Sequence, residues 1–445
     1  MIFLSPLFIY KNREEVKYLL ERIRLRYQKN IIWLYPLKYI LIACLISFLV
    51  ISVDYKYTSI HQYIPKFLMT NKSLAQTILS SLVSAIITIT TFTFSTTMVV
   101  LTMYSSQFSP RVVQNFLSEK MTLKVLGIFM GGFFYFITSL LFIKGVENSD
   151  TFISATVGVI YAVVCLIYFA LFIFKVSASI QANNLIEELY KEAGDSIKRA
   201  VDSHHEFAFK CNDSSIIGKN RKNFFSIASN KNGYIQSIDY MAIMKSVNYS
   251  NTSIKLEIRN GNFIVLGQPL LDIYTDSEIS SEDIRDISNK INDYILVDNS
   301  RNISYDYMYA IEKIVDISLR AISPGINDPN TAIQCINILG ILLSMMSKES
   351  SNACRMSLDE ENIEIIYQYF DFKNDIYKTF YQIVIYGGQD ISVVMAIIKA
   401  LKNISYNAEE ENIELLNEIK DYVYEKTLGN FKNEMDKEKI KELMQ

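Results

Sequence analysis

The amino-acid sequence predicts an α-helical membrane protein with four transmembrane helices and a cytoplasmic α+β region. Half of the 445 residues are hydrophobic and only 20% are charged, which excludes a disordered, collagen-like or disulfide-stapled protein. The charge is unevenly divided: residues 1–175 carry 16 Lys and Arg against 7 Asp and Glu, whereas residues 176–445 carry 28 against 40. A basic, apolar front and an acidic, normally charged back indicate a membrane domain joined to a soluble region.

Four stretches of the front part are long and apolar enough to cross a bilayer, whose core of roughly 30 Å needs about 20 helical residues. They lie at about 32–53, 78–103, 125–143 and 151–174. The segment 1–30 is charged and mixed in composition, so we expect a cytoplasmic extension and not a cleavable signal. The sequence therefore predicts a four-helix transmembrane domain over residues 31–175, with the lipid bilayer as a partner.

The distribution of Lys and Arg predicts the orientation of these helices, because basic residues gather on the cytoplasmic side. Seven precede the first predicted span and three lie between the second and third, whereas the opposite side carries four. An even number of spans with this bias places both termini in the cytoplasm. The large C-terminal part is then cytoplasmic as well.

The second predicted span is rich in hydroxyl side chains and carries no charge. Fourteen serine and threonine residues lie between Thr77 and Ser106. Many recur at steps of three and four, which places them on one helical face. The candidate pore-lining residues on this face are Thr77, Ser81, Ser84, Thr88, Thr91, Ser95 and Thr102.

This hydroxyl face has two interpretations. Hydroxyl groups can replace the hydration of an ion or solute without charge, which predicts a pore lining. The alternative is helix packing, because Ser and Thr are small and can bond their own i−4 carbonyls. Gly127, Gly131 and Gly132 in the third span offer a matching surface for close packing, and this favours the alternative.

A short interfacial helix is expected directly after the second span. Ser109 is placed to cap it, and Pro110 occupies its first position, where proline is favoured. Arg111 lies on the polar side of this segment. We expect the helix to lie at the membrane surface.

Beyond the fourth span, we expect a continuous stalk helix and a linker over residues 176–230, then a small β-barrel-like module over residues 231–276. Alternating apolar residues from Ile254 to Ile258 stand beside Asn260-Gly261, which is typical of a hairpin turn. The stretch also resembles the hairpin of lipoyl- and biotinyl-type modules, with Lys245 as the lysine to be modified. The spacing does not place Lys245 in the turn, which favours a purely structural module.

Residues 280–445 have a helical pattern and predict a cytoplasmic helical domain. Asp316 and Arg320 are spaced i, i+4, as in an intrahelical ion pair. Asp328 and Thr331 flank a proline at the predicted start of the next helix, and Asn327 precedes them. These residues could hold an anionic ligand at a helix N-terminus, but Asp328 would repel an anion, which favours a capped joint between two helices.

No motif predicts an enzyme, a metal site or a cofactor. The chain contains no G-x-S-x-G, H-E-x-x-H or phosphate-binding loop. Its five cysteines are scattered without C-x-x-C spacing, and its three histidines are too few for most zinc sites. The acidic C-terminal part has no basic stripe, so nucleic acid is not expected as a partner.

Three blocks of sequence resemble a bacterial family of predicted membrane proteins catalogued as domain of unknown function 2254. They are FSTTMVVLTMYSSQFSPRVVQNFL with LGIFMGGFFYF, NGYIQSID with NGNFIVLGQPL, and VDISLRAISPGINDPNTA. The resemblance implies four spans, a cytoplasmic C-terminal region and the bacterial cell membrane, but no established activity. Asp306 matches the family pattern, whereas Tyr305 stands where a glutamine is more frequent.

These observations favour a homo-oligomeric channel or passive transport protein with a cytoplasmic gating or assembly domain. The alternative is a membrane-anchored scaffold or sensor whose cytoplasmic part binds a partner or small ligand. In the first case an ion or solute, which the sequence does not specify, passes along the hydroxyl face; in the second that face serves packing only.

Overall fold

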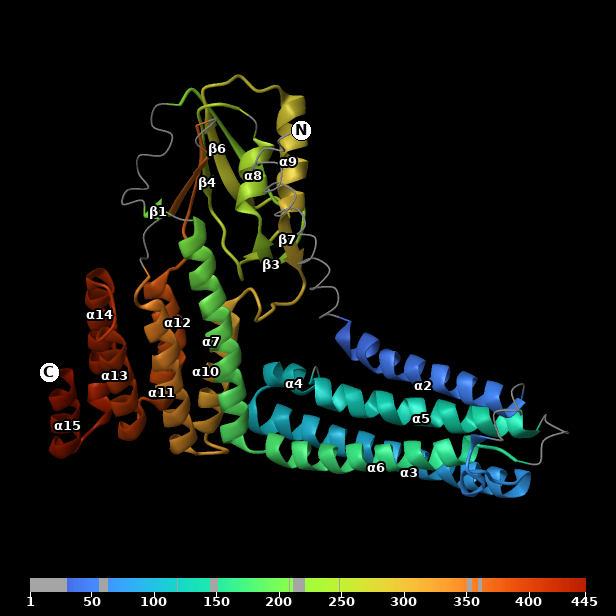
Figure 1. Cartoon of the computed structure of the whole chain (residues 1–445). Helices are drawn as coiled ribbons and strands as arrows, with labels where there is room; N and C mark the ends of the chain where they lie inside the picture. Colours follow the sequence, from blue (N-terminus) through green and yellow to red (C-terminus); the bar gives the residue numbers. More distant parts are fainter. Residues whose placement is uncertain are drawn as a thin grey trace. The chain divides into compact units, whose positions relative to one another are not determined.

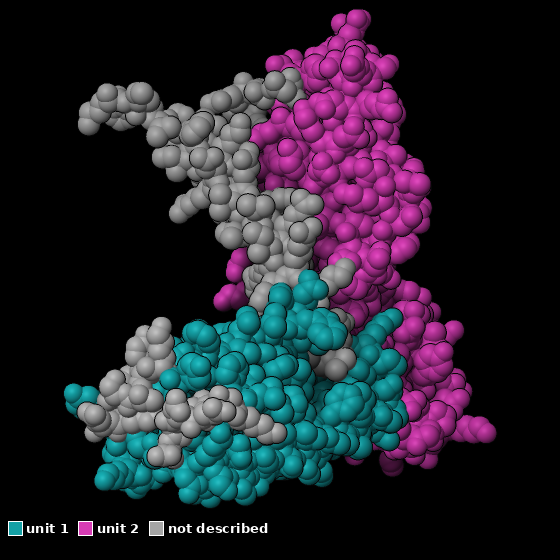
Figure 2. All heavy atoms as spheres, turned by 90° about the vertical axis from the view of Figure 1, so that its right-hand side faces the viewer, with its two compact units in different colours: residues 1–181 teal, residues 182–445 magenta. Residues whose placement is uncertain are grey.

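The computed structural model describes residues 30–55, 63–117, 119–144, 151–207, 209–210, 221–247, 249–349, 354–358 and 362–445. The chain divides into two compact units, unit 1 with residues 1–181 and unit 2 with residues 182–445 (Figures 1 and 2). The predicted cytoplasmic segment before Asn30 lies outside the described residues, as does part of the predicted linker after α7.

Long apolar helices that run alongside one another build unit 1 (Figure 1). Its helices and helical turns are α2 (Ile31–Tyr55), η2 (Lys66–Leu68), α3 (Lys72–Met103), η3 (Tyr104–Phe108), α4 (Pro110–Leu117), α5 (Lys120–Lys144) and α6 (Ser154–Ser179). The four predicted spans fall in α2, α3, α5 and α6, and each helix begins and ends within six residues of the predicted limits.

A buried carboxylate connects the end of α2 to the start of α6. Asp54 is 5% exposed, and its two oxygens accept hydrogen bonds from the backbone N–H groups of Ile153 (2.9 Å) and Ser154 (3.1 Å). The first N–H groups of a helix have no partner within it. Asp54 therefore caps a helix that begins about 100 residues later, and Tyr135 of α5 donates to the Ser154 carbonyl at the same place.

Five described helices are long and apolar enough to cross a membrane, judged by length and composition. Four belong to unit 1: α2, α3 together with η3, α5 and α6. The fifth is α11 (Pro329–Met346) of unit 2, which is not among the predicted spans. It packs against α7, α10 and α13, and its residues Cys335, Ile336 and Leu339 are fully buried. The apolar composition of α11 is thus explained by its position inside a helical layer.

The predicted stalk helix continuing from the fourth span is wrong, because the chain turns at Ile180 and Gln181. The Gln181 N–H donates to the Ala178 carbonyl, an i−3 bond that tightens the end of α6. A separate helix, α7 (Ala182–Phe207), follows. Its apolar face packs on α10 and α11 within unit 2, so α6 and α7 bury their side chains in different units.

In the described part of unit 2 the strands form two open sheets, and the predicted barrel-like module is wrong. One sheet has six strands in the order β1-β8-β9-β4-β6-β2, and the other has the order β5-β3-β7. All pairs are antiparallel except β4 with β9. The strands are β1 (Phe209–Lys210), β2 (Asn223–Ala228), β3 (Gly233–Ile238), β4 (Thr252–Leu256), β5 (Phe263–Ile264), β6 (Pro269–Thr275), β7 (Ile295–Asp298), β8 (Cys354–Leu358) and β9 (Ile363–Tyr367).

The predicted turn at Asn260-Gly261 is present, but the predicted hairpin is not. Gly261 has a φ of +83°, and the Asn262 N–H donates to the Arg259 carbonyl across a β-turn. The strand before the turn, β4, pairs with β6 and β9, whereas β5 after it pairs with β3. The turn therefore carries the chain from one sheet to the other. Lys245 lies on α8 and not in a hairpin turn, so the carrier-module alternative does not fit.

Helices cover the sheet and form a separate layer. The helices α8 (Tyr240–Ser246) and α9 (Ser281–Tyr294) lie beside the strands (Figure 1). Their buried side chains share one hydrophobic core with residues of both sheets. The other helices of unit 2 are α10 (Tyr307–Ala321), α11, α12 (Phe372–Gly387), α13 (Ile391–Ser405), α14 (Glu410–Thr427), the turn η5 (Leu428–Asn430) and α15 (Glu434–Met444). The prediction of a purely helical stretch after residue 280 is wrong at β7, β8 and β9. These strands pair with β3, β1 and β4, which are distant in sequence, and β8 also pairs with its neighbour β9.

Candidate functional site

The predicted pore-lining residues form an exposed face of α3. On the single chain, all seven are exposed: Thr77, Ser81, Ser84, Thr88, Thr91, Ser95 and Thr102. The buried residues of the same helix are Ala75, Leu79, Ile86, Thr93 and Val100. At 100° per residue these two sets lie on opposite sides of the helix. We call the seven exposed residues the hydroxyl face.

Most side chains of the hydroxyl face donate their proton to their own helix. The hydroxyl groups of Thr77, Thr88 and Thr91 bond the carbonyl four residues earlier at 2.9–3.0 Å. Ser81, Ser84 and Thr102 do the same. A hydroxyl group has one O–H donor and two acceptor lone pairs. Because the donor is used within the helix, the oxygen lone pairs remain available to accept hydrogen bonds from outside.

The glycines of α5 pack on other helices and do not cover the hydroxyl face. A Cβ on Gly127 would lie 2.8 Å from Pro36 Cα, and one on Gly131 would lie 2.9 Å from Ala43 Cβ, both in α2. Gly132 faces α6 in the same way. The close-packing surface of the third span therefore serves α2 and α6.

The segment after α3 has the predicted start of a helix. Ser109 accepts a hydrogen bond from the Arg111 N–H at 3.2 Å, and α4 begins at Pro110. Ser109 is buried, whereas Pro110 and Arg111 are exposed. Between α3 and α4 the π-helical turn η3 begins with Tyr104, whose hydroxyl donates to the Ser179 carbonyl of α6 at 2.8 Å. The location of α4 at a membrane surface stays a prediction.

The predicted joint between two helices of unit 2 is present. Asp328 caps α11 by accepting hydrogen bonds from the Thr331 N–H (3.1 Å) and hydroxyl (2.5 Å), and these bonds lower the pKa of Asp328. Asn327 has a positive φ of 51°. Asp316 and Arg320 both lie on α10, Asp316 partly buried and Arg320 exposed. The Asp328 carboxylate thus occupies the N-terminus of α11, the position at which the sequence allowed an anionic ligand as one interpretation.

A polar cleft in unit 2 gathers charged side chains from three regions of the chain, at residues 259, 301–312 and 375–378, that are far apart in the sequence. It has a volume of about 70 Å³ and lies between the Arg259–Asn262 turn, the segment before α10, α10 itself and α12. Its charged lining residues are Arg259, Arg301, Asp306, Glu312, Asp375 and Lys378. None of the predicted residues from Asp316 to Thr331 lines it.

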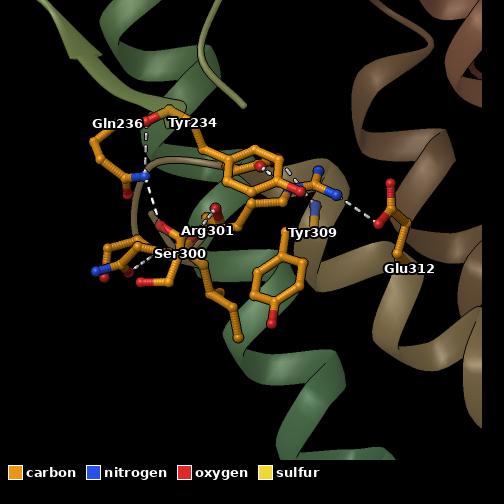
Figure 3. A network of polar contacts seen from close by, with 11 residues as sticks. Tyr234, Gln236, Ser300, Arg301, Tyr309 and Glu312 are labelled. Carbon is orange, nitrogen blue, oxygen red and sulfur yellow. Dashed lines mark hydrogen bonds and ion pairs between the residues drawn. The ribbon is translucent and has the colours of Figure 1, made fainter. Parts of the chain in front are cut away.

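Arg301 is held firmly on one side of the polar cleft. Its Nε lies 2.6 Å from Asp306 and its Nη1 lies 2.6 Å from Glu312 (Figure 3). Its guanidinium also lies 4.9 Å from the ring centre of Tyr309 and 6.0 Å from that of Tyr234, within the range of cation–π attraction. Burial opposes its charge, but the two carboxylates outweigh this and raise the pKa of Arg301.

Strand β3 positions two parts of the polar cleft. The Gln236 side-chain amide donates to the Ser300 carbonyl at 2.8 Å, next to Arg301 (Figure 3). One residue earlier, the Ile235 carbonyl accepts a hydrogen bond from the Gly261 N–H at 2.9 Å. Both segments that carry the arginines are therefore attached to the same strand.

The opposite side of the polar cleft contains a buried carboxyl group with looser contacts. Asp375 accepts a hydrogen bond from the Tyr307 hydroxyl at 2.7 Å, and its other oxygen lies 3.8 Å from Arg259 Nη2. Arg259 also lies 3.5 Å from Asp371. Burial raises the pKa of Asp375 to about 6, although Arg259 and the Tyr307 hydrogen bond pull it down. This carboxyl group can exchange a proton close to neutral pH.

Sequence reasoning missed the polar cleft, although some of its residues occupy recognisable positions. Arg259 directly precedes the Asn-Gly turn, and Asp306 caps α10 by accepting from the Tyr309 N–H. Asp375 stands in the first turn of an apolar helix, yet it is 0% exposed. No pattern in the neighbouring sequence indicates that Arg259, Asp306 and Asp375 line the same cleft. No group of three or more His, Cys, Asp or Glu that could hold a metal occurs among the described residues.

Comparison with known proteins adds bacterial relatives without an assigned activity. Uncharacterized protein Mb1321c of Mycobacterium bovis and Uncharacterized protein Rv1290c of Mycobacterium tuberculosis are each 24% identical over 331 residues. The match covers 71% of this chain and spans only 60% of the length of these relatives. No solved structure matches the chain. The model of the family described as Predicted membrane protein (DUF2254) matches residues 29–403, and the chain is a multi-pass membrane protein that belongs to this family.

Proposed function

We propose that this membrane protein is a homo-oligomeric channel or passive transport protein. In this proposal the hydroxyl faces of α3 from several copies surround a path, and unit 2 is a cytoplasmic domain that assembles or gates it. The observation that carries the proposal is the exposure of all seven hydroxyl-face residues on the side of α3 opposite to its buried residues.

The composition of α3 supports this arrangement. It is the least apolar of the four long helices of unit 1. The seven residues of its hydroxyl face are exposed, and its buried residues lie on the opposite side. A helix that is buried in lipid on its outer side presents apolar side chains there. A second copy of the chain, with water between the copies, gives the hydroxyl face a suitable environment.

The chemistry of the hydroxyl face favours cations or hydrogen-bond-donating solutes over anions. Since most of its protons are used within α3, oxygen lone pairs are what it offers to a permeating species. The helix carries no charged residue between Lys72 and Arg111. Its C-terminal end also presents backbone carbonyls, where a positive charge is favoured.

We further propose that α2, α3, α5 and α6 cross the membrane and that α11 does not. Burial of α11 among other helices of unit 2 supports this assignment. With four crossings, the excess of Lys and Arg before the first span and between the second and third supports cytoplasmic termini.

A flux assay tests conduction directly. The full chain is reconstituted in liposomes, and the release of potassium and sodium is followed by ion-sensitive dyes. The double variant Thr88→Val, Thr91→Val keeps the side-chain shape but removes two exposed hydroxyl groups, and we expect it to lower the rate of ion release by about tenfold. Thr93→Val is the matched control, because Thr93 is 3% exposed on the buried side of α3. Silent liposomes with monodisperse protein would reject the channel.

The polar cleft favours a second candidate, a membrane-anchored sensor whose soluble unit binds a small ligand. Charged side chains from three regions of the chain converge there, and Arg259 and Asp375 each keep one buried polar atom without a hydrogen-bond partner. Silent liposomes together with ligand binding to unit 2 would favour this sensor over the channel. The hydroxyl face would then serve contacts between helices only.

A further inference from the structure

Three buried polar atoms of the polar cleft have no hydrogen-bond partner. They are Oδ1 of Asp375, Nη1 of Arg259 and Oδ1 of Asn260, and all three residues line the cleft. The Asp375 side chain is 1% exposed. Leaving such groups unpaired costs free energy, and native proteins satisfy nearly all of them. A molecule bound in the cleft could supply the partners that these atoms lack.

The unpaired atoms define what that molecule must offer. Two are carbonyl or carboxylate oxygens, which accept hydrogen bonds, and one is a guanidinium nitrogen, which donates. A partner must therefore donate to Asp375 and Asn260 and accept from Arg259. Asp375 and Arg259 approach only to 3.8 Å, so a molecule placed beside them can reach both.

The charge of the cleft limits the class of ligand further. Its lining holds three cationic residues, Arg259, Arg301 and Lys378, against three acidic ones, Asp306, Glu312 and Asp375. An anion would meet three carboxyl groups, and an organic cation would meet three basic residues. A zwitterion adds no net charge and can pair each of its ends with an opposite one. Arg301 is already engaged by Asp306 and Glu312. Of the other two cationic residues, Arg259 has the buried nitrogen without a partner and so suits the negative end.

The size of the cleft and its apolar residues complete the description. A volume of about 70 Å³ suits a small molecule. Tyr240, Met308 and Tyr369 also line the cleft and can contact a short aliphatic group. In an α-amino acid, a single carbon separates the ammonium from the carboxylate, so the two ends can meet partners that are themselves adjacent.

We propose that the polar cleft binds a small zwitterionic amino acid, with its carboxylate on Arg259 and its ammonium on Asp375 and Asn260. This inference is independent of conduction along α3, because binding is measured without flux. If the ligand controls the membrane unit, binding precedes any effect on transport.

Isothermal titration calorimetry on the full chain in detergent tests the proposal. Glycine and L-alanine are the probes, and acetate and methylamine, which carry only one of the two charged ends, are the comparison probes. We expect both amino acids to bind with Kd in the millimolar range or below, and each one-ended probe to bind about tenfold more weakly or worse. Equal binding of acetate and glycine would indicate an anion site, and absence of heat with all four probes would indicate a cleft filled by water; either result overturns the proposal.

Variants locate the site. Arg259→Gln and Asp375→Asn are each expected to weaken glycine binding by about tenfold or more, because each leaves one charged end without a partner. Lys373→Gln is the matched control: it removes a charge from α12, but Lys373 is 57% exposed and pairs with Glu418. Unchanged binding in both cleft variants would overturn the site. If a cleft variant fails to fold, Arg259→Lys and the four probes on the unaltered chain still decide the question.

Discussion

Gly261 and Asp306 lie so close together that a Cβ on Gly261 would be 2.5 Å from the Asp306 carboxylate. The two residues belong to different edges of the polar cleft, the β-turn after β4 and the N-cap of α10. Asp306 is itself fixed by Arg301 and by the Tyr309 N–H. The absence of a side chain at position 261 therefore lets the turn that carries Arg259 reach the start of α10.

Replacing Gly261 by alanine should destabilise unit 2 through this contact. The positive φ of +83° costs about 1–2 kcal/mol for a residue with a Cβ, and the collision with Asp306 adds to it. Gly267→Ala is a matched control, because Gly267 has a φ of +85° but no atom within 4 Å of its Cβ position. Thermal unfolding in detergent should show a larger loss for Gly261→Ala by about 1–3 kcal/mol. Equal losses would mean that the contact with Asp306 contributes nothing.

The cap that Asp54 provides for α6 predicts a second stability effect. Asp54→Ala leaves the N–H groups of Ile153 and Ser154 without this acceptor, and we expect a loss of about 1–3 kcal/mol. Ser52→Ala in the same helix is the control, since its hydroxyl bonds only the Phe48 carbonyl within α2. Thermal unfolding and size-exclusion chromatography in detergent measure the effect. An unfolding temperature for Asp54→Ala equal to that of Ser52→Ala would contradict the role of the cap.

The raised pKa of Asp375 predicts how the stability of unit 2 changes with pH. A carboxyl group whose pKa is about 6 in the folded chain and near 3.8 in the unfolded chain binds its proton more tightly when folded. Its stabilising contribution is present below about pH 4 and is lost as the pH rises through 6, in total about 3 kcal/mol. Asp375→Asn cannot titrate and should lose this dependence.

Hydrogen exchange with mass spectrometry can follow this change in α10 and α12. The wild-type chain and Asp375→Asn are compared at each pH, so the intrinsic pH dependence of exchange cancels. Protection of the wild-type peptides should fall relative to the variant between pH 4 and 7. Parallel profiles would show that Asp375 does not titrate in this window.

The hydroxyl face predicts a pattern of chemical accessibility in the membrane. In a chain whose five cysteines are replaced by alanine, Thr88→Cys, Thr91→Cys and Ser95→Cys should react with a charged methanethiosulfonate reagent. Only a thiolate reacts, and a thiolate forms in water and not in lipid. Val163→Cys on α6 is the control, because Val163 is 50% exposed but belongs to an apolar helix. We expect the α3 positions to react about tenfold faster or more; equal, slow reaction at all four would place the hydroxyl face in lipid or between helices.

The features that local sequence predicts are those set by a few neighbouring residues. The long helices of unit 1 follow from runs of apolar side chains, and the cap of α11 follows from Asp328 and Thr331, which are three positions apart. Contacts between residues that are far apart in the sequence could not be predicted in this way. Strand β4 pairs with β9, which lies about 110 residues further along, and Asp54 caps α6 about 100 residues away. The polar cleft is formed by residues that are far apart in the sequence. The sequence could therefore predict local features of single residues, but not that these residues lie together.

The hydrogen bond from Tyr104 to Ser179 gives the end of α3 a mechanical attachment. Ser179 is the last residue of α6, and α7, the first helix of unit 2, begins three residues later. The residue that accepts the Tyr104 hydrogen bond is therefore separated from α7 by only two residues. Any movement of Ser179 must either break this hydrogen bond or carry the end of α3 with it.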